Sequence, residues 1–245
     1  MNQVKVLSFE TLDSTSDEAK RQTLPGSNHL LAIWAKQQTA GHGRYGRIWH
    51  SPPGNLYVSL LLQDESPLPQ LAQLSFVTAV AAGMPLLTLL PKTTDFFYKW
   101  PNDLVINHHK AAGILLESLS RPEAKQLVLG LGMNILHTPE IPDRPVTSLS
   151  QAGVIFPEGT DPVAYMLDKF LQSFSRYYAL WKKEGFAPIR DIWLQRAWRM
   201  NETIAVDLGN QKISGIFRDI TLKGELVLEE TNGNTRYITA GEIFY

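Results

Sequence analysis

The sequence predicts an α+β fold: a mixed sheet with helices packed on it, followed by a small β-barrel at the C-terminus. Three observations support this. Apolar runs rich in β-branched and aromatic residues cluster between residues 29 and 135. Apolar residues recur at helical spacing in 69–90 and 165–186. From Asn201 onward, short strands alternate with glycine-containing turns, which is typical of a barrel of about 45 residues.

The first quarter of the chain should hold three strands and one short helix. Asp13 to Ser16 supply side chains that cap a helix N-terminus, and a Pro-Gly pair stops that helix. The expected elements are a strand at 4–9, a helix to about Leu24 that Pro25-Gly26 ends, and strands at 29–37 and 55–62.

After residue 62, turn residues and hydrophobic periodicity again predict the helices and strands. Five prolines between residues 136 and 162 indicate a loop, and helical spacing returns after it. The expected elements are strands at 95–107, 110–119 and 124–135, helices at 165–186 and 188–199, and turns at 208–210, 223–224 and 232–234.

The segment from Ser66 to Pro91 contains no charged residue and is long enough to cross a bilayer. Within its apolar part at 71–90, Gln73, Ser75, Thr78 and Thr88 dilute the hydrophobicity and Pro85 interrupts it, and no basic cluster flanks it. We therefore expect a buried helix at 69–90 and no membrane partner.

The bulk composition bounds the function. With 245 residues the chain can form one domain with a small appendage, and we place the division at 1–198 and 199–245. A net charge of −1 gives no general attraction to nucleic acid. Cysteine is absent and the N-terminus lacks the pattern of a secretion signal, which together favour the cytoplasm.

The stretch GHGRYGRIW (41–49) formally contains GxGxxG after a strand. A dinucleotide-binding turn would open directly into a helix, whereas this stretch runs through Ser51-Pro52-Pro53-Gly54 into another strand, so we reject that interpretation. Arg44 and Arg47 could pair with phosphate oxygens, and Trp49 could lie against a flat ring. A plain solvated surface loop remains an alternative.

The stretch KWPNDLVINHHKAAGILLE (99–117) carries many polar groups for a core segment. We single out Lys99, Asn102, Asp103 and Lys110, because the turn at 107–109 returns Lys110 close to Asn102 and Asp103. The small residues after Lys110 allow a ligand or another backbone to approach closely, which indicates an anion-binding lysine. An exposed sheet edge with ordinary charges is the alternative.

The stretch GLGMN (130–134) has glycines at alternate positions and ends in Asn134. Glycine weakens a strand unless the space is needed, so Gly130 and Gly132 indicate either a flat wall for a ligand or a β-bulge. No HExxH or GxSxG motif is present, so the sequence favours neither a metal site nor a hydrolase triad.

Taken together, these stretches resemble the biotin protein ligases. The family's glycine-arginine loop is matched by residues 41–47, its KWPND by 99–103, its KxxGIL by 110–115 and its GxGxN by 130–134. The resemblance implies the biotin/lipoate ligase fold with an SH3-like C-terminal domain. It also implies that biotin and ATP, with Mg²⁺, form biotinyl-5′-adenylate, and that biotin passes to a lysine of the biotin carboxyl carrier protein of acetyl-CoA carboxylase.

The resemblance also implies a role for individual residues. Catalysis would depend on Lys110, Asp103 and Arg44. Biotin would contact Ser14, Thr15, Gln38, Gly41, His42, Arg44, Lys110, Gly113 and Gly130. ATP would contact Arg44, Arg47, Trp49, Asn102, Lys110 and Asn134.

Two positions depart from the family pattern, which usually has Asn or Asp at Ser16 and often Arg or Lys at His42. The chain starts at the catalytic domain, without the winged helix of relatives that repress transcription, so DNA regulation is not expected. The resemblance is compatible with a monomer or a homodimer. A lipoate ligase or octanoyl transferase of the same fold is the nearest alternative, and a non-catalytic binding module is a more distant one.

Overall fold

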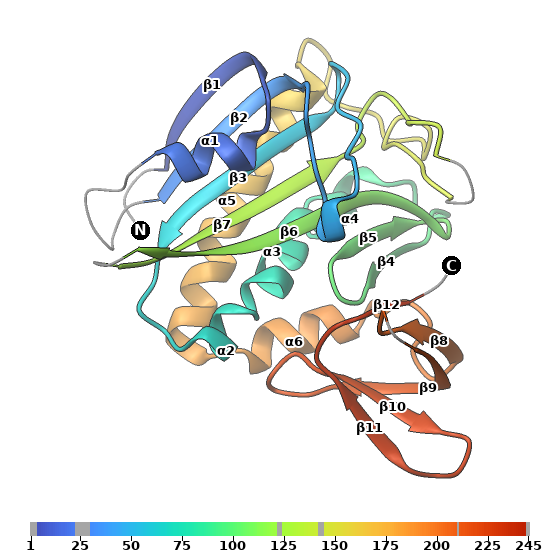
Figure 1. The fold of residues 1–245 in the computed structure, drawn as a ribbon. Coiled ribbons are helices and arrows are strands. Elements are labelled where there is room, and N and C mark those ends of the chain that lie inside the picture. The colour runs from blue at the N-terminus through green and yellow to red at the C-terminus, as the bar shows by residue number, and fades with distance from the viewer. Residues whose placement is uncertain (1–3, 23–29, 122–123, 142–144, 210, 244–245) are drawn as a thin grey trace.

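The computed structural model describes residues 4–22, 30–121, 124–141, 145–209 and 211–243. These residues form a seven-stranded sheet with helices on both of its faces and a separate five-stranded antiparallel sheet near the C-terminus (Figure 1). The predicted α+β architecture is therefore confirmed.

The large sheet is mixed, because its first two strands run parallel and all its other neighbouring strands run antiparallel. Its strand order is β1-β2-β3-β7-β6-β5-β4. The strands are β1 (Lys5–Leu12), β2 (Leu30–Gln38), β3 (Leu56–Gln63), β4 (Phe96–Lys99), β5 (Asp103–Ile106), β6 (His109–Arg121) and β7 (Ala124–Met133).

The prediction of one strand over 95–107 is wrong. This segment is a hairpin, in which β4 and β5 pair antiparallel and Lys99 lies directly opposite Asp103. Pro101 sits in the turn, where its missing N–H and fixed φ are tolerated, whereas inside a strand both would interrupt the hydrogen-bond ladder. The hairpin brings the two ends of the KWPND stretch side by side.

Helices cover the large sheet unequally (Figure 1). On one face the main apolar core joins the sheet to α3 and α5, and on the other a smaller cluster joins it to α1. Alternate residues of β3 and β7 therefore face different helices. The helices are α1 (Thr15–Arg21), α2 (Leu68–Leu71), α3 (Leu74–Gly83), α4 (Leu86–Leu89), α5 (Pro162–Glu184) and α6 (Ala187–Leu194), with a 3₁₀ turn η1 (Arg44–Gly46).

The apolar segment Leu68–Leu89 is split into α2, α3 and α4, with Pro85 at the second break. By length and composition it could cross a membrane, but 67% of its most apolar window is buried inside the protein. It packs as a core helix, as the sequence predicts.

Three helix ends differ from the sequence prediction by three residues or more. α1 ends at Arg21, and Leu24 and Pro25-Gly26 lie outside the described residues. α5 begins at Pro162, because the side chain of Asp161 accepts hydrogen bonds from the first free backbone N–H groups. α6 ends at Leu194, five residues earlier than expected.

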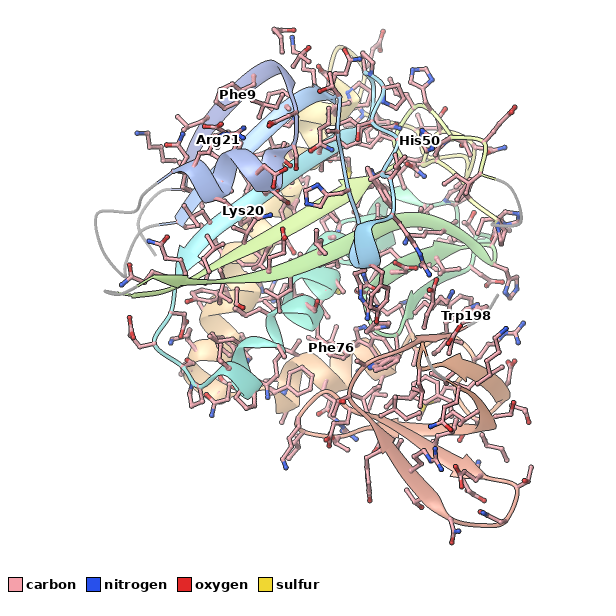
Figure 2. The ribbon with its side chains drawn as sticks, viewed as in Figure 1. Phe9, Lys20, Arg21, His50, Phe76 and Trp198 are labelled. Carbon is pink, nitrogen blue, oxygen red and sulfur yellow. The ribbon has the colours of Figure 1, made fainter. Side chains whose placement is uncertain are left out.

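The small sheet has the order β11-β10-β9-β8-β12. Its strands are β8 (Thr203–Asp207), β9 (Lys212–Ile220), β10 (Leu226–Glu230), β11 (Thr235–Ile238) and β12 (Glu242–Ile243). The expected turns at 223–224 and 232–234 are present, with Gly224 and Gly233 at positive φ. Gly209 also has a positive φ, and Asn210 of the third expected turn lies outside the described residues. Phe76 of α3 lies where the helices meet this sheet (Figure 2), because its ring packs on Phe186 and would contact any side chain at Gly224.

Candidate active site

A pocket lies on the α1 face of the large sheet, where three glycines leave the sheet without side chains. Gly132 of β7 pairs with Gly113 of β6, and Gly130 pairs with Ser59 of β3. The register of β7 is unbroken against both neighbours, so the β-bulge alternative for GLGMN is wrong. The glycines form the flat wall that the sequence suggested.

The indole of Trp49 lies on this wall. A Cβ atom placed at Gly132 would be 2.4 Å from Cε2 of Trp49, and one placed at Gly113 would be 3.1 Å from Cζ3. The ammonium of Lys110 lies 5.4 Å from the indole centroid, within the range of a cation–π contact. The wall thus accepts a flat ring, with a cation above it.

The end of the pocket beside α1 is lined by buried hydroxyl groups. Ser14 caps the helix by accepting from the N–H of Asp17. Thr15 donates from its backbone N–H and its hydroxyl to Oε1 of Gln38, at 2.8 and 3.0 Å. Its hydroxyl also lies 2.9 Å from that of Ser59, which lies 3.1 Å from that of Ser16. This end is polar, shielded from water and already hydrogen-bonded.

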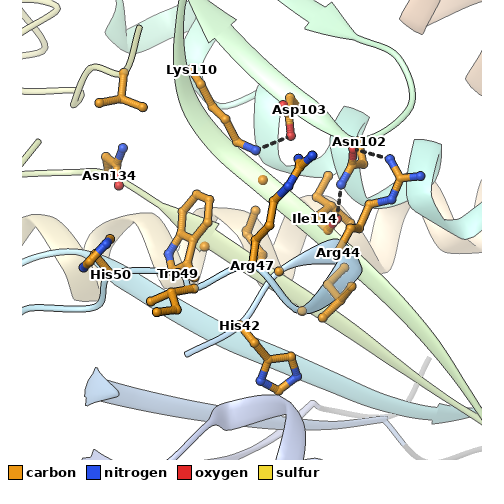
Figure 3. Close-up of a pocket in the computed structure, with 18 of the residues that line it drawn as sticks. His42, Arg44, Arg47, Trp49, His50, Asn102, Asp103, Lys110, Ile114 and Asn134 are labelled. Atoms are coloured by element: carbon orange, nitrogen blue, oxygen red, sulfur yellow. Dashed lines mark hydrogen bonds and ion pairs between the residues drawn. The ribbon is translucent and has the colours of Figure 1, made fainter. Parts of the chain in front are cut away.

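Lys110 and Asp103 form an ion pair, with Nζ and Oδ1 2.6 Å apart (Figure 3). Their side chains are 23% and 14% exposed, so the alternative of an exposed edge with ordinary charges is wrong. The backbone of Lys110 is fixed from the other side, where its N–H donates to Pro145 and its carbonyl accepts from Thr147. A positioned cation and a positioned carboxylate therefore share one site.

The glycine-arginine loop closes over the same pocket (Figure 3). Arg44 donates to Oδ1 of Asn102 and to the carbonyl of Gly241, both at 3.3 Å. Arg47 pairs with Glu242 at 2.6 Å, and this hydrogen bond raises the pKa of Arg47. The loop is thereby tied to β12 of the small sheet, and it opens into no long helix, as the rejection of a dinucleotide-binding turn requires.

Gly41 is the first residue of the loop. A Cβ atom there would be 2.6 Å from the Ser51 hydroxyl and 2.8 Å from Nε2 of Gln38, so only glycine fits without rearrangement. Nδ1 of His42 is 3.9 Å from Asp17, a contact that becomes an ion pair only when the imidazole is protonated. Gly41 thus shapes the site without lining it.

Asn134 is buried and donates from Nδ2 to the carbonyl of Thr147 at 3.0 Å. Its Oδ1 has no hydrogen-bond partner among the described residues. A buried acceptor of this kind in a pocket wall is free to receive a ligand N–H.

Lys99 is 2% exposed, and its ammonium lies 5.2 Å from the ring centroid of Trp198.

Almost all residues expected in the site line this one pocket. They are Ser14, Thr15, Gln38, His42, Arg44, Arg47, Trp49, Asn102, Asp103, Lys110, Gly113, Gly130 and Asn134. Sequence reasoning missed three neighbours: Ser51, Ser59 and Glu242. Ser59 is one serine in an apolar strand, and only its register opposite Gly130 reveals it.

The comparisons with known proteins agree with this geometry. The model of the biotin/lipoate A/B protein ligase family matches residues 8–134, and that of the biotin protein ligase C terminal domain matches residues 200–245. A biotin–[acetyl-CoA-carboxylase] ligase of Paracoccus denitrificans is 35% identical over 95% of this chain and 97% of its own length. The chain belongs to the biotin/lipoate A/B protein ligase family.

Other members of the biotin/lipoate A/B protein ligase family show the same relationship. The bifunctional ligase/repressor of Bacillus subtilis is 31% identical over 94% of this chain and 71% of its own length. The biotin protein ligase of Aquifex aeolicus, solved in complex with biotin and ATP, superposes with a TM-score of 0.78 at 27% identity. That match covers 98% of this chain and 97% of the other.

Proposed function

We propose that the chain is a biotin–[acetyl-CoA-carboxylase] ligase. It joins biotin to ATP as biotinyl-5′-adenylate, releases pyrophosphate, and passes biotin to a lysine of the biotin carboxyl carrier domain of acetyl-CoA carboxylase. The observation that carries this proposal is the Lys110–Asp103 pair, 2.6 Å apart, in the same pocket as the hydroxyls beside α1 and the two loop arginines. The names of the Paracoccus and Aquifex proteins support the same substrates.

In the activation step, the biotin carboxylate attacks the α-phosphate of ATP and pyrophosphate leaves. Negative charge concentrates between the two reactants, and Lys110 and Arg44 are the cations that stabilise it. Arg47 holds phosphate oxygens, and Asn102 and Asn134 contact the nucleotide. Trp49 packs against adenine. ATP brings Mg²⁺, which is held mainly by the substrate phosphates in reactions of this kind.

In the transfer step, the amine of the carrier lysine attacks the acyl carbon of the adenylate. A C–N bond forms, the bond from that carbon to the phosphate oxygen breaks, and AMP leaves. Asp103 accepts the proton that the amine loses, because its carboxylate lies in the pocket, 2.6 Å from the Lys110 ammonium.

The polar end of the pocket distinguishes biotin from the substrates of the nearest alternative. Lipoate and octanoate present a long apolar chain, which would offer no polar partner to the remaining hydrogen-bonding capacity of Thr15, Ser16 and Gln38 on the pocket side. The cyclic urea of biotin offers N–H donors and a carbonyl acceptor to the same groups.

The wider assignments belong to the same proposal. Residues 1–198 form the catalytic domain and 199–245 the SH3-like domain, because the Trp198 N–H still donates to Tyr98 of the large sheet and β8 starts at Thr203. The protein works in the cytoplasm as a monomer or homodimer, without nucleic acid or membrane.

The direct test is biotin transfer in vitro. The protein, ATP-Mg²⁺ and labelled biotin are incubated with a purified carrier domain and with a variant in which arginine replaces its acceptor lysine. We expect label on the first carrier alone and none when lipoate replaces biotin. Transfer of lipoate without transfer of biotin would overturn the proposal.

A further inference from the structure

We propose that Ser59, a buried serine of β3 behind the pocket, is a positioning residue that sets the direction of the hydrogen bonds at the α1 end. The proposal rests on the proposed function, because it concerns how the biotin ring is held. Ser59 is 0% exposed and does not line the pocket, whereas its neighbours Thr15 and Ser16 do. Ser59 therefore acts through them.

Two backbone groups fix the orientation of the Gln38 amide. The backbone N–H of Thr15 can only donate, so the Gln38 atom 2.8 Å away is the oxygen. The carbonyl of Trp49 can only accept, so the Ser51 hydroxyl, 2.8 Å away, gives it its single proton. The Ser51 oxygen must then accept from Gln38, and the Gln38 atom 2.9 Å away is the nitrogen. Both ends give the same amide orientation.

The direction of hydrogen-bond donation is also fixed at the buried hydroxyls, because each hydroxyl has one proton and can donate only once. Thr15 must donate to the Gln38 oxygen, so at the 2.9 Å contact with Ser59 it can only accept. Ser59 has then used its proton, and at the 3.1 Å contact with Ser16 it can only accept. Each group donates to the next in the order Ser16, Ser59, Thr15, Gln38 and Ser51, and the Trp49 carbonyl accepts at the end.

This order decides what the pocket offers a ligand. The protons of Thr15 and Ser16 are used inside the protein, so both hydroxyls present only lone pairs to the pocket. Gln38 keeps one N–H that Ser51 does not use. Such a surface suits a ring with N–H donors and a carbonyl acceptor, as in a cyclic urea. Hydrogen bonds in one direction also polarise one another, which strengthens Thr15 as an acceptor.

The test is the Ser59→Ala variant. It removes the donor to Thr15 and frees the Ser16 proton, so the Thr15 and Ser16 hydroxyls no longer present only acceptors to the pocket. We expect biotin affinity, measured by calorimetry without ATP, to fall about tenfold or more, as for a buried group that loses its partner. The KM for biotin should rise by the same factor. The KM for ATP and kcat, both at saturating biotin, should change less than about threefold.

Three further variants separate positioning from packing. Thr78→Val removes an equally buried hydroxyl, that of Thr78 in α3, outside the pocket, and should leave biotin affinity unchanged. Ser59→Thr keeps the hydroxyl and should restore most of the affinity. Ser16→Ala removes both the first donor and an acceptor that faces the pocket, so it should also lower biotin affinity.

Several results would overturn the inference. A folded Ser59→Ala variant with wild-type biotin affinity would do so, as would an equal loss in Thr78→Val or an unchanged affinity in Ser16→Ala. If Ser59→Ala does not fold, the Ser51→Ala variant interrupts the series of hydrogen bonds at its other end. Normal biotin affinity in that variant would also overturn the inference. A wild-type protein that binds no biotin would refute the proposed function, and the inference with it.

Discussion

The ammonium of Lys110 lies 2.6 Å from the carboxylate of Asp103, so the two groups neutralise each other across the floor of the pocket. An α-phosphate that enters the site competes with Asp103 for this ammonium. When the phosphate engages Lys110, Asp103 loses its partner and becomes available as a proton acceptor. Once a phosphate has separated the pair, Lys110 can therefore serve the activation step and Asp103 the transfer step.

Removal of the cation should stop activation. Lys110→Ala is expected to fold and to lose about a hundred- to a thousandfold in the rate of adenylate formation, because a positioned charge donor is removed from the transition state. Pyrophosphate release measures this rate. The control is Lys183→Ala on the exposed side of α5, which should be unaffected. Near-normal turnover by Lys110→Ala would exclude the lysine from the mechanism.

Asp103 should matter more for transfer than for activation. Asp103→Asn still forms adenylate, because it removes no positive charge from the phosphate chemistry, but it cannot accept the proton of the carrier lysine. Purified biotinyl-adenylate, added to enzyme and carrier domain, isolates the second half-reaction. A defect confined to pyrophosphate release, with normal transfer from added adenylate, would contradict this role.

Biotin and ATP should bind cooperatively. The loop 41–54 contains six glycines or prolines, and Ser51 links its backbone at Trp49 to Gln38 at the biotin end. If biotin holds Gln38, the loop is already ordered when ATP binds, so ATP binding costs less conformational entropy. We expect a coupling of about 1–3 kcal/mol, equal in both directions by linkage.

Titration of a non-hydrolysable ATP analogue, with and without saturating biotin, measures this coupling. Ser51→Ala should reduce this coupling, because the Ser51 hydroxyl that links Gln38 to the Trp49 carbonyl is lost. Equal ATP affinities in the two wild-type titrations would show that biotin does not organise the loop.

Asp64 should make stability depend on pH. Burial alone would raise the pKa of this carboxyl, but hydrogen bonds from Ser66, Tyr178 and Lys182 outweigh burial, and the net pKa is lowered. A carboxyl with a lowered folded-state pKa stabilises the protein above its unfolded pKa of 3.8, and this contribution disappears as the pH falls through the folded-state value.

Asp64→Asn should lower the free energy of unfolding near neutral pH by about 1–3 kcal/mol, because charge-assisted hydrogen bonds to a buried group are lost. Between about pH 5 and pH 3 the variant should lose less stability than the wild type. Urea unfolding across this range measures both effects, with the exposed Asp168→Asn as control. Parallel pH profiles for Asp64→Asn and wild type would contradict the role of this carboxyl.

Local patterns predicted most strands of the fold, because alternation and turn residues act over a few positions. The prediction of one strand over 95–107 failed because apolar residues lie on both sides of Pro101, and only the antiparallel pairing of β4 with β5 shows that the chain folds back there. The start of α5 was missed because Asp161-Pro162 lies in a proline-rich stretch that otherwise reads as a loop.

The site was predicted unevenly for a related reason. Lys110 and Asp103 are seven positions apart, so a single turn brings them together. Glu242 reaches Arg47 across 195 positions, and Ser59 reaches Thr15 only because β3 lies beside β7 beneath α1. Neither contact leaves a trace in local spacing.

The central claim is that this pocket activates biotin with ATP. Its most direct test is pyrophosphate release by the purified protein with ATP-Mg²⁺ and either biotin, lipoate or no acid, with biotinyl-adenylate identified by mass spectrometry. We expect release that depends on biotin, an adenylate of biotin, and loss of both in Lys110→Ala. Release that depends on lipoate, or no release with biotin from a folded protein, would contradict it.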